Sequence, residues 1–385
     1  MRVLILGGDG YLGWPTAMHF SARGHDVMVA DNMIKRYWEA EVGVEPLIPV
    51  PTLYARVKRW KEVSGREIKL RVGDIARNAR FVYEMLDDFK PEAVVHYAEQ
   101  PSAPYSMFDR DKCVQTQVNN VAGTLNLLFG LRHSCPDAHI VKLGTMGEYG
   151  TPNIDIEEGW LDVTHNGRKD RVLYPKKPGS FYHLSKVHDS HNLEFACRIW
   201  GCRVTDLNQG VVYGIDTDET AKDAALATSF HYDAIFGTVL NRFVVQAVHG
   251  LPLSVYGKGG QTRGFLNIRD TLRCVELAVT NPAKAGEFRV FNQFTEQFSV
   301  MDLAERVQRV ARKRNLKAEI EHLPNPRVEA EEHYFNAKHS ALPALGLKPN
   351  LLTDPVIEHM IAMVQGAHGR IDPAIVAPTV AWRQK

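Results

Sequence analysis

The chain has 385 residues, enough for one large α/β unit or two smaller domains, and its 44% apolar and 24% charged residues are ordinary for a folded protein. The net charge of +1 leaves no basic excess for nucleic acid, and the five scattered cysteines argue against a metal site and a disulfide framework. No apolar run approaches the roughly 18 residues of a membrane helix, and a strand-like run already starts at residue 2. We therefore expect a cytoplasmic protein with no membrane insertion and no targeting peptide.

A glycine-rich turn follows the first expected strand, at residues 2–6. Gly7, Gly10 and Gly13 have the spacing Gly-x-x-Gly-x-x-Gly and precede a helical stretch. Glycines in such a turn let backbone N–H groups approach a pyrophosphate at the start of the helix. The pattern therefore predicts a dinucleotide site.

An acidic residue ends the second expected strand. Asp31 follows the apolar run 27–30 and lies roughly 20 residues beyond the glycines, where a carboxylate holds the ribose hydroxyls of adenosine. A carboxylate at this position repels a 2′-phosphate, so Asp31 favours NAD over NADP. Arg36 could instead accept that phosphate, which tempers the preference.

Strands and helices alternate up to about residue 210. Further strands are expected at 70–73, 93–97, 140–143 and 202–207, and residues 33–69 are expected to form an inserted excursion. The alternation predicts an α/β fold with a Rossmann-type doubly wound parallel sheet. We place the cofactor domain at residues 1–210, to which some later segments return, and a smaller C-terminal α/β substrate-binding lobe at residues 211–385.

The stretch 180–186 holds Tyr182 and Lys186 in a Tyr-x-x-x-Lys pair. On a helix these side chains lie one turn apart on the same face. An ammonium beside a phenol stabilises the phenolate, so we expect the pKa of Tyr182 to fall toward the working pH. Such a tyrosine can take a proton from a sugar hydroxyl.

The glycine motif, Asp31, Thr145 and the Tyr182–Lys186 pair, in this order, resemble the extended short-chain dehydrogenases/reductases that act on nucleotide sugars. A likeness to the UDP-sulfoquinovose synthase family runs over nearly the whole chain. It is carried by residues 145–158, 181–191, 256–263, 324–333 and Trp382.

The resemblance implies UDP-glucose and sulfite as substrates, tightly held NAD as cofactor, and a homodimer built through helices of the cofactor domain. It implies oxidation at C4 of the sugar, loss of the C5 hydrogen and the C6 hydroxyl, addition of sulfite at C6, and reduction at C4. The alternatives are an NAD-retaining 4-epimerase or dehydratase on the same scaffold, and a non-catalytic NAD-sensing regulator. The sequence identifies no protein that would deliver the sulfite.

The resemblance also assigns catalytic roles. Tyr182 would take the proton of the C4 hydroxyl, and Thr145 would steady the C4 oxygen. Ordinary 4,6-dehydratases place an Asp-Glu pair directly after the threonine, whereas here the carboxylate arrives one residue later, as Glu148. We expect Glu148 to take the C5 proton, with an ion pair as the alternative. We expect His183 to act as the acid at C6 or to contact sulfite, unless it faces away from the site.

The binding residues complete the expected site, which contains no metal ligand. The expected cofactor contacts are Gly7, Gly10, Tyr11, Leu12, Gly13, Asp31, Asn32, Arg36, Asp74, Ile75, Asn119, Tyr182, Lys186 and Val212. The expected substrate contacts are Gln100, Ser102, Thr145, Tyr182, Asn208, Gln209, Thr238, Arg242, Tyr256, Gln261, Arg263, Arg327 and Glu329. The arginines among them are suited to a diphosphate.

The chain departs from the family at Pro101. The resemblance implies that plant members carry an arginine at this position, thought to help hold sulfite. In this chain Gln100, Ser102 and backbone N–H groups are weaker substitutes.

Overall fold

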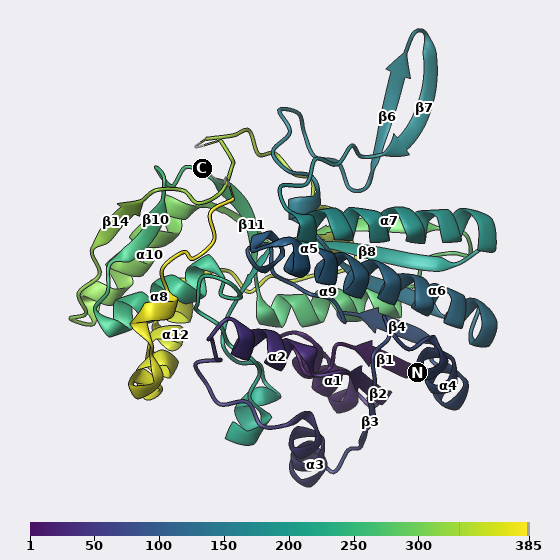
Figure 1. Ribbon diagram of the computed structural model, residues 1–385, viewed down its shortest axis with the longest axis horizontal. Helices are drawn as coiled ribbons and strands as arrows, with labels where there is room; N and C mark the ends of the chain where they lie inside the picture. The colour runs from purple at the N-terminus through teal and green to yellow at the C-terminus, as the bar shows by residue number, and fades with distance from the viewer. Residues whose placement is uncertain (331, 383–385) are drawn as a thin grey trace.

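The computed structural model describes residues 1–330 and 332–382 and shows a central sheet with a smaller lobe beside it (Figure 1). Neighbouring strands of the central sheet all pair in parallel, in the order β3-β2-β1-β4-β5-β8-β12. The strands are β1 (Arg2–Leu6), β2 (Asp26–Asp31), β3 (Ile68–Val72), β4 (Ala93–His96), β5 (His139–Thr145), β8 (Arg203–Gln209) and β12 (Phe288–Gln293). The predicted Rossmann-type doubly wound sheet is confirmed.

Both faces of this sheet are buried, which is why its strands read as apolar runs in the sequence. Successive side chains of a strand point to opposite faces, so Val3 and Ile5 belong to one hydrophobic cluster and Leu4 and Leu6 to another. The first cluster includes side chains of α1 (Gly13–Ala22), α3 (Leu53–Ser64) and α9 (Ile268–Thr280), together with Leu342. Three other helices supply the second: α4 (Ala79–Phe89), α6 (Gly123–Ser134) and α7 (Phe181–Trp200).

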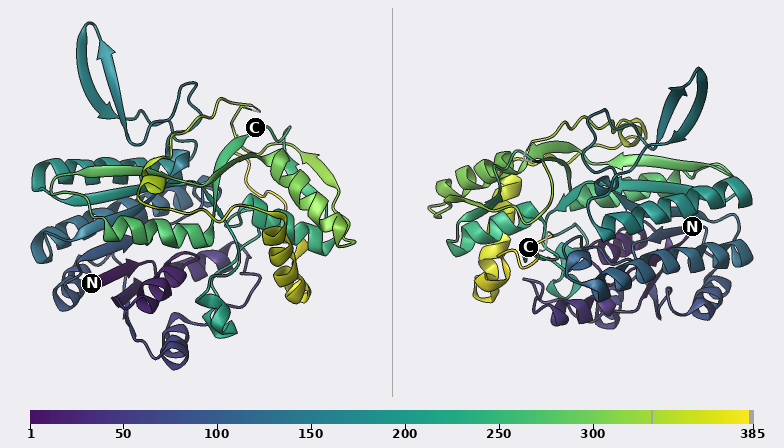
Figure 2. Two further views of the ribbon diagram at one scale, coloured as in Figure 1. Left: turned by 180° about the vertical axis from the view of Figure 1, so that it is seen from behind. Right: turned by 45° about the horizontal axis from the view of Figure 1, so that its top comes forward.

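Two segments depart from a simple alternation of strands and helices. The helical segment between β4 and β5 is divided into α5 (Arg110–Gln117) and α6 by a π-helical turn at Val118–Ala122. Residues 160–173 form an antiparallel hairpin, β6 (Trp160–His165) and β7 (Arg168–Leu173), that projects from the body of the molecule (Figures 1 and 2). No pattern in the sequence had indicated this hairpin.

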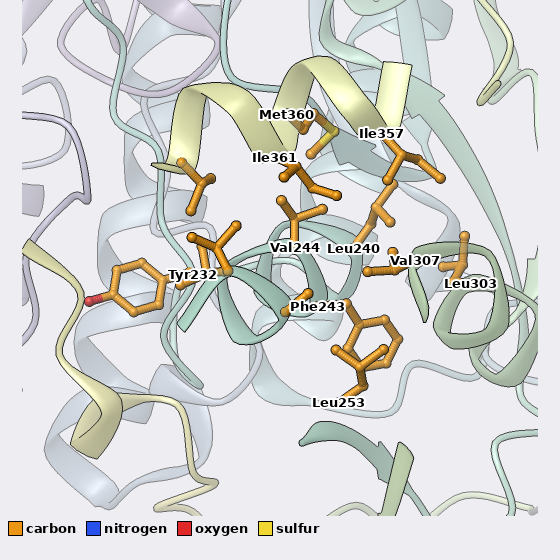
Figure 3. Packing of buried hydrophobic residues seen from close by; sticks show 14 of the residues in the cluster. Tyr232, Leu240, Phe243, Val244, Leu253, Leu303, Val307, Ile357, Met360 and Ile361 are labelled. Atoms are coloured by element: carbon orange, nitrogen blue, oxygen red, sulfur yellow. The ribbon is translucent and has the colours of Figure 1, made fainter. Parts of the chain in front are cut away.

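The smaller lobe is built around a hydrophobic cluster of its own. Phe243 and Val244 of α8 (Val239–His249) pack in this cluster with Val307 and with Ile357 and Ile361 (Figure 3). The other elements of the lobe are α10 (Val300–Lys313), α12 (Asp354–Gly366) and the short strands β9 (Val211–Tyr213), β10 (Leu253–Tyr256), β11 (Thr262–Asn267), β13 (Glu296–Ser299) and β14 (Ile320–Leu323). Between these segments the chain returns to the main sheet, where α9 and β12 lie.

The strand order reverses direction between β1 and β4, and ligands of such sheets bind beyond the carboxyl ends of the strands at this point.

The excursion after β2 forms α2 (Ile34–Glu41) and α3, and a short helix α11 (Ala341–Ala344) packs near β12. Within the described part of the chain, no helix combines the length and the apolar character needed to cross a membrane.

Candidate active site

A cavity of about 1250 Å³ lies at the carboxyl ends of the central strands and extends to the lobe. It brings together most of the residues expected from the sequence. Those that line it are Gly7, Gly10, Tyr11, Leu12, Gly13, Asp31, Asn32, Asp74, Ile75, Ser102, Asn119, Thr145, Tyr182, His183, Gln209, Val212, Thr238, Arg242, Tyr256, Gln261, Arg263, Arg327 and Glu329. Five expected residues lie outside its wall: Arg36, Gln100, Glu148, Lys186 and Asn208.

The glycine turn between β1 and α1 forms one end of the cavity. A Cβ atom at Gly13 would lie 1.9 Å from the carbonyl oxygen of Gly7, so this glycine is required by the packing of the turn itself. A Cβ atom at Gly10 would meet only that same carbonyl, at 3.4 Å, and Gly10 faces the cavity. A side chain at Gly10 would therefore occupy ligand space, and the turn fits a pyrophosphate approached by backbone N–H groups.

The carboxylate of Asp31 ends β2 at the cavity wall. It accepts hydrogen bonds from the backbone N–H of Asp9 at 2.8 Å and of Met33 at 2.7 Å. Burial raises the pKa of Asp31 to about 6. These contacts fix the carboxylate where a ribose would lie, so the residues at this end of the cavity fit NAD.

Arg36, an expected cofactor contact, lies outside the cavity wall and is paired with another side chain. Its Nε lies 2.6 Å from a carboxylate oxygen of Asp9, and Arg56, whose side chain is fully buried, also pairs with Asp9. Because Arg36 neutralises Asp9, its guanidinium is not free to receive a 2′-phosphate.

The first turn of α7 carries Tyr182 and His183, two of the residues expected to be catalytic. Ser180 caps the helix through a hydrogen bond from the backbone N–H of His183 to its Oγ, at 3.1 Å. The N–H of Tyr182 donates to Oγ of Ser106 at 3.0 Å, and both Tyr182 and His183 line the cavity. Thr145 stands at the end of β5, where its Oγ accepts from the N–H of Gly147 at 3.1 Å. Its hydroxyl hydrogen is thus left for a substrate oxygen.

Lys186 does not lower the pKa of Tyr182 in this structure, so that expectation is wrong for the protein alone. Its Nζ pairs with Oε2 of Glu99 at 2.6 Å and donates to the carbonyl of Leu143 at 2.6 Å. The distance from Nζ to the ring centre of Tyr182 is 5.8 Å. Burial, and after it the charge of Glu99, raises the pKa of Tyr182 above its usual value.

Glu148 lies beneath the cavity in a buried ion-pair cluster, so the structure does not support it as the C5 base. Its carboxylate accepts hydrogen bonds from Nζ of Lys142 at 3.3 Å and Oγ of Ser190 at 3.1 Å, and it pairs with Lys176. Burial alone would raise the pKa of Glu148, but Lys142 and Lys176 overcome this effect and hold it at about 2. The ion pair that the sequence left as an alternative is the arrangement found.

His183 faces the cavity and is held in one orientation. Its Nδ1 lies 3.0 Å from Oγ of Ser180, and its Nε2 lies over Gly147, where an added Cβ would come within 2.3 Å. Burial lowers the pKa of His183 to about 3, so the imidazole is neutral near pH 7. A neutral ring nitrogen beside Tyr182 can accept a proton.

Three arginines from the lobe side form the other end of the cavity. Arg263 pairs with Glu329 at 2.5 Å, Arg242 stacks over Tyr256, and Arg327 lines the same wall. Burial, and then the charges of Arg263 and Arg242, lowers the pKa of Arg327. Guanidinium groups this close to one another suit a diphosphate, which would balance their charge.

Gln100 and Asn208 are fully buried and do not reach the cavity, so their expected contacts with substrate are wrong. The side-chain amide of Gln100 donates to Thr116 Oγ at 2.8 Å, which holds the turn after β4. The amide of Asn208 donates to the hydroxyl of Tyr149 at 2.7 Å. Both side chains therefore support the loops behind the site.

Three cavity features were missed from the sequence. Glu99 lines the wall two residues after Tyr97, and its place at the end of a parallel strand was an available signal. Lys177 lines the wall just before the catalytic helix. Residues 378–382 cross the cavity, with Val380 packed near Trp38 and the backbone N–H of Trp382 bonded to the carbonyl of Pro326. In the sequence, only the family resemblance at Trp382 indicated that this segment belongs to the site.

Comparison with known proteins places the chain in a family. The model of the NAD dependent epimerase/dehydratase family matches residues 3–292. The chloroplastic UDP-sulfoquinovose synthase of Spinacia oleracea is 55% identical over 383 residues, which cover 100% of this chain and 79% of that protein. The UDP-sulfoquinovose synthase of Sulfolobus acidocaldarius is 43% identical over 387 residues, which cover 100% and 98%. A crystal structure of UDP-glucose 4-epimerase from Bifidobacterium longum in complex with NAD⁺ and UDP shares the fold, with a TM-score of 0.69, 19% identity, and coverage of 94% and 97%. The chain therefore belongs to the NAD dependent epimerase/dehydratase family and, within it, to the UDP-sulfoquinovose synthase branch.

Proposed function

We propose that this protein makes UDP-sulfoquinovose from UDP-glucose and sulfite, with NAD as its cofactor. One observation carries the proposal. Thr145, Tyr182 and His183 lie in one cavity between a turn that fits a dinucleotide and a wall of arginines that suits a nucleoside diphosphate. The likeness to UDP-sulfoquinovose synthases covers this chain completely, which favours this reaction over the other chemistries of the fold.

Tyr182 and Thr145 act at C4 of the sugar. The oxygen of Tyr182, once ionised, takes the proton of the C4 hydroxyl, and the hydroxyl of Thr145 donates a hydrogen bond to the C4 oxygen. When bound, NAD supplies the oxidation and the later reduction at C4. Because Tyr182 keeps the proton within the buried site, the same residue can return it to the C4 oxygen.

His183 replaces Glu148 as the proposed base at C5. A ketone at C4 acidifies the C5 hydrogen, and the neutral Nε2 of His183 accepts that proton. The imidazolium then donates the proton to the C6 hydroxyl, which leaves as water. The sulfur lone pair of hydrogen sulfite forms the new bond at C6, and the proton of hydrogen sulfite passes to C5. One nitrogen facing the cavity can serve both carbons, whereas the carboxylate of Glu148 is engaged by two lysines.

Lys177 is the proposed receiver of the sulfite anion. Pro101 brings no charge, and the hydroxyl of Ser102 donates to the carbonyl of Ile235 at 2.6 Å. Lys177 lines the cavity next to Gly150 and, within the described residues, forms no ion pair or side-chain hydrogen bond. An ammonium without a counter-charge beside the catalytic helix can attract a small anion.

A homodimer through helices of the cofactor domain is also proposed. The outer surfaces of α6 and α7, which lie side by side in Figure 1, expose large apolar side chains. Phe129 is 48% exposed on α6, and Phe195 and Ile199 are 49% and 53% exposed on α7. Several large apolar side chains exposed on neighbouring helices mark an association surface. A second copy of the chain would cover them.

The proposal is tested by incubating the purified protein with UDP-glucose, NAD and sulfite and determining the mass of the nucleotide sugar. A sulfonated product is expected, and it should be absent when sulfite is left out. A product isomeric with UDP-glucose would instead indicate a 4-epimerase, and a stable product lacking one water would indicate a dehydratase. A Tyr182→Phe variant, which lacks the hydroxyl, serves as the control.

A further inference from the structure

Glu99 is a buried acid in direct contact with the catalytic pair. It follows β4 by three residues, its side chain is 1% exposed, and it lines the cavity. Its Oε2 lies 2.6 Å from Nζ of Lys186, whose remaining contact is the carbonyl of Leu143 at the end of β5. The ammonium is therefore held between the ends of two neighbouring strands.

Lys186 is the only cation that meets this carboxylate at close range within the described residues. Apart from this ion pair, neither oxygen of Glu99 has a hydrogen-bond partner there. Nε2 of His96 is 4.0 Å from Oε1, but burial lowers the pKa of His96 to about 4, so the ring is neutral near pH 7. Burial, and after it the charge of Glu99, raises the pKa of the nearby Asp189 carboxyl, so Asp189 supplies no positive charge to Glu99. The charge of Glu99 is thus balanced mainly by Lys186.

The charge of the same carboxylate also acts on Tyr182. The other charged or titratable groups around this phenol are Lys142 from β5, Glu148 from the turn after β5, and His183 and Lys186 from α7. After burial, Glu99 is the strongest influence that keeps the phenol protonated. Glu99 therefore acts on Tyr182 in two ways, by its own charge and by holding Lys186 away from the phenol oxygen.

We propose that Glu99 is a positioning residue for Lys186 and thereby sets the pH range in which Tyr182 can accept the substrate proton. The inference rests on the proposed function, in which Tyr182 is the group that takes this proton. It assigns no contact between Glu99 and the substrate. The carboxylate of Glu99 thus joins the Tyr182–Lys186 pair as the group that controls where the ammonium of Lys186 lies.

The first test measures the ionisation of Tyr182 in the purified protein, without substrate. Tyrosine labelled with ¹³C at Cζ gives one resonance for each phenol, and the signal of Tyr182 is identified by its loss in Tyr182→Phe. In the wild type this signal should show no ionisation up to pH 10. In Glu99→Gln ionisation should begin at a pH where the wild-type phenol is still fully protonated, because loss of one neighbouring charge lowers a pKa by about one to three units.

A matched control is Glu92→Gln, which removes the same charge at the opposite end of β4, where Glu92 pairs with Arg2 at the surface. It should leave the Tyr182 signal unchanged. The proposal is overturned if Tyr182 in Glu99→Gln titrates as in the wild type, or if wild-type Tyr182 already ionises near neutral pH.

The second test measures reduction of NAD on mixing with UDP-glucose, as the nicotinamide absorbance band, across pH. The acidic limb of this rate should move to lower pH in Glu99→Gln, in the same direction as the NMR titration. Glu99→Asp keeps the charge on a shorter side chain, so Tyr182 should ionise within one unit of the wild type while the rate falls because Lys186 is held less well. A wild-type rate in Glu99→Asp would contradict the positioning role, even if Glu99→Gln does not fold. If UDP-glucose reduces no NAD in the wild type, the proposed function fails, and the NMR titration still decides the role of Glu99.

Discussion

Replacing Glu148 by glutamine leaves Lys142 and Lys176 facing a neutral amide inside the protein. The pKa of Glu148 is about 2 instead of the ordinary 4.5, and one unit corresponds to about 1.4 kcal/mol, so its ionised form contributes about 3 kcal/mol to the free energy of unfolding. This agrees with the roughly 3–5 kcal/mol lost when one member of a buried ion pair is removed. Because the folded-state pKa is depressed, the contribution is complete above pH 4.5 and is lost as the pH falls toward 2.

The measurement is urea unfolding at pH 7, followed by tryptophan fluorescence. We expect the free energy of unfolding to fall by about 3 kcal/mol in Glu148→Gln. The matched control is Glu157→Gln, because Glu157 pairs with Lys338 where both side chains are about half exposed. Such a surface pair contributes at most about 1 kcal/mol. As the pH falls from 4.5 to 3, the difference in the free energy of unfolding between the wild type and Glu148→Gln should become smaller.

The chemistry separates the structural role from a catalytic one. The folded fraction of Glu148→Gln should still exchange the C5 hydrogen of UDP-glucose with D₂O, whereas His183→Asn should reduce NAD but fail to exchange it. A Glu148→Gln protein that unfolds like the wild type and exchanges no C5 hydrogen would refute the placement of this carboxylate beneath the cavity.

Four further changes test other parts of the site. Asp31→Ala should lower the NAD retained through purification, which is read from the nucleotide content of the denatured protein; finding NADP in the wild type would contradict the expected preference. Tyr182→Phe should cut turnover by roughly 10²–10⁴-fold while UDP-glucose still binds, and unchanged turnover would show that the phenol is structural. Lys177→Gln should raise the KM for sulfite several-fold without changing the KM for UDP-glucose, whereas Lys177→Arg should keep the KM for sulfite near the wild-type value. Equal KM values for sulfite in all three proteins would exclude the lysine as the anion contact. Phe129→Glu should convert the expected homodimer into a monomer, as measured by light scattering. A wild-type protein that is already a monomer would rule out the surface on α6 and α7 as a dimer interface.

The Rossmann half was readable from the sequence for physical reasons. Strands buried on both faces give continuous apolar runs such as residues 2–6, and the glycine spacing follows from a turn that admits no Cβ at Gly13. The first turn of α7 was also readable, since Ser180 caps it three residues before His183. Local patterns were sufficient wherever one element alone determined the arrangement.

Contacts between distant segments were not readable. The position of Glu148 after Thr145 did not reveal that a 3₁₀ turn at Met146–Glu148 directs the carboxylate inward. Its partners Lys142 and Lys176 come from a strand and from the loop before α7. In the same way, the pairing of Arg36 with Asp9 joins the excursion after β2 to the glycine turn. Whether a charged side chain faces the open cavity or a buried counter-charge depends on packing between distant segments, which the local spacing of residues does not encode.

The segment that crosses the cavity near the C-terminus has a practical consequence for handling the protein. Val380 packs near Trp38 and Tyr105, and the Trp382 ring lies over Arg327. The N-terminus lies at the amino end of β1, which begins at Arg2, whereas the cavity lies at the carboxyl ends of the strands (Figure 1). An affinity tag or a fluorescent reporter attached at the N-terminus leaves this wall intact. One that displaces residues 378–382 opens the cavity to solvent, so a loss of activity in such a fusion reflects the missing wall and not a failure to fold.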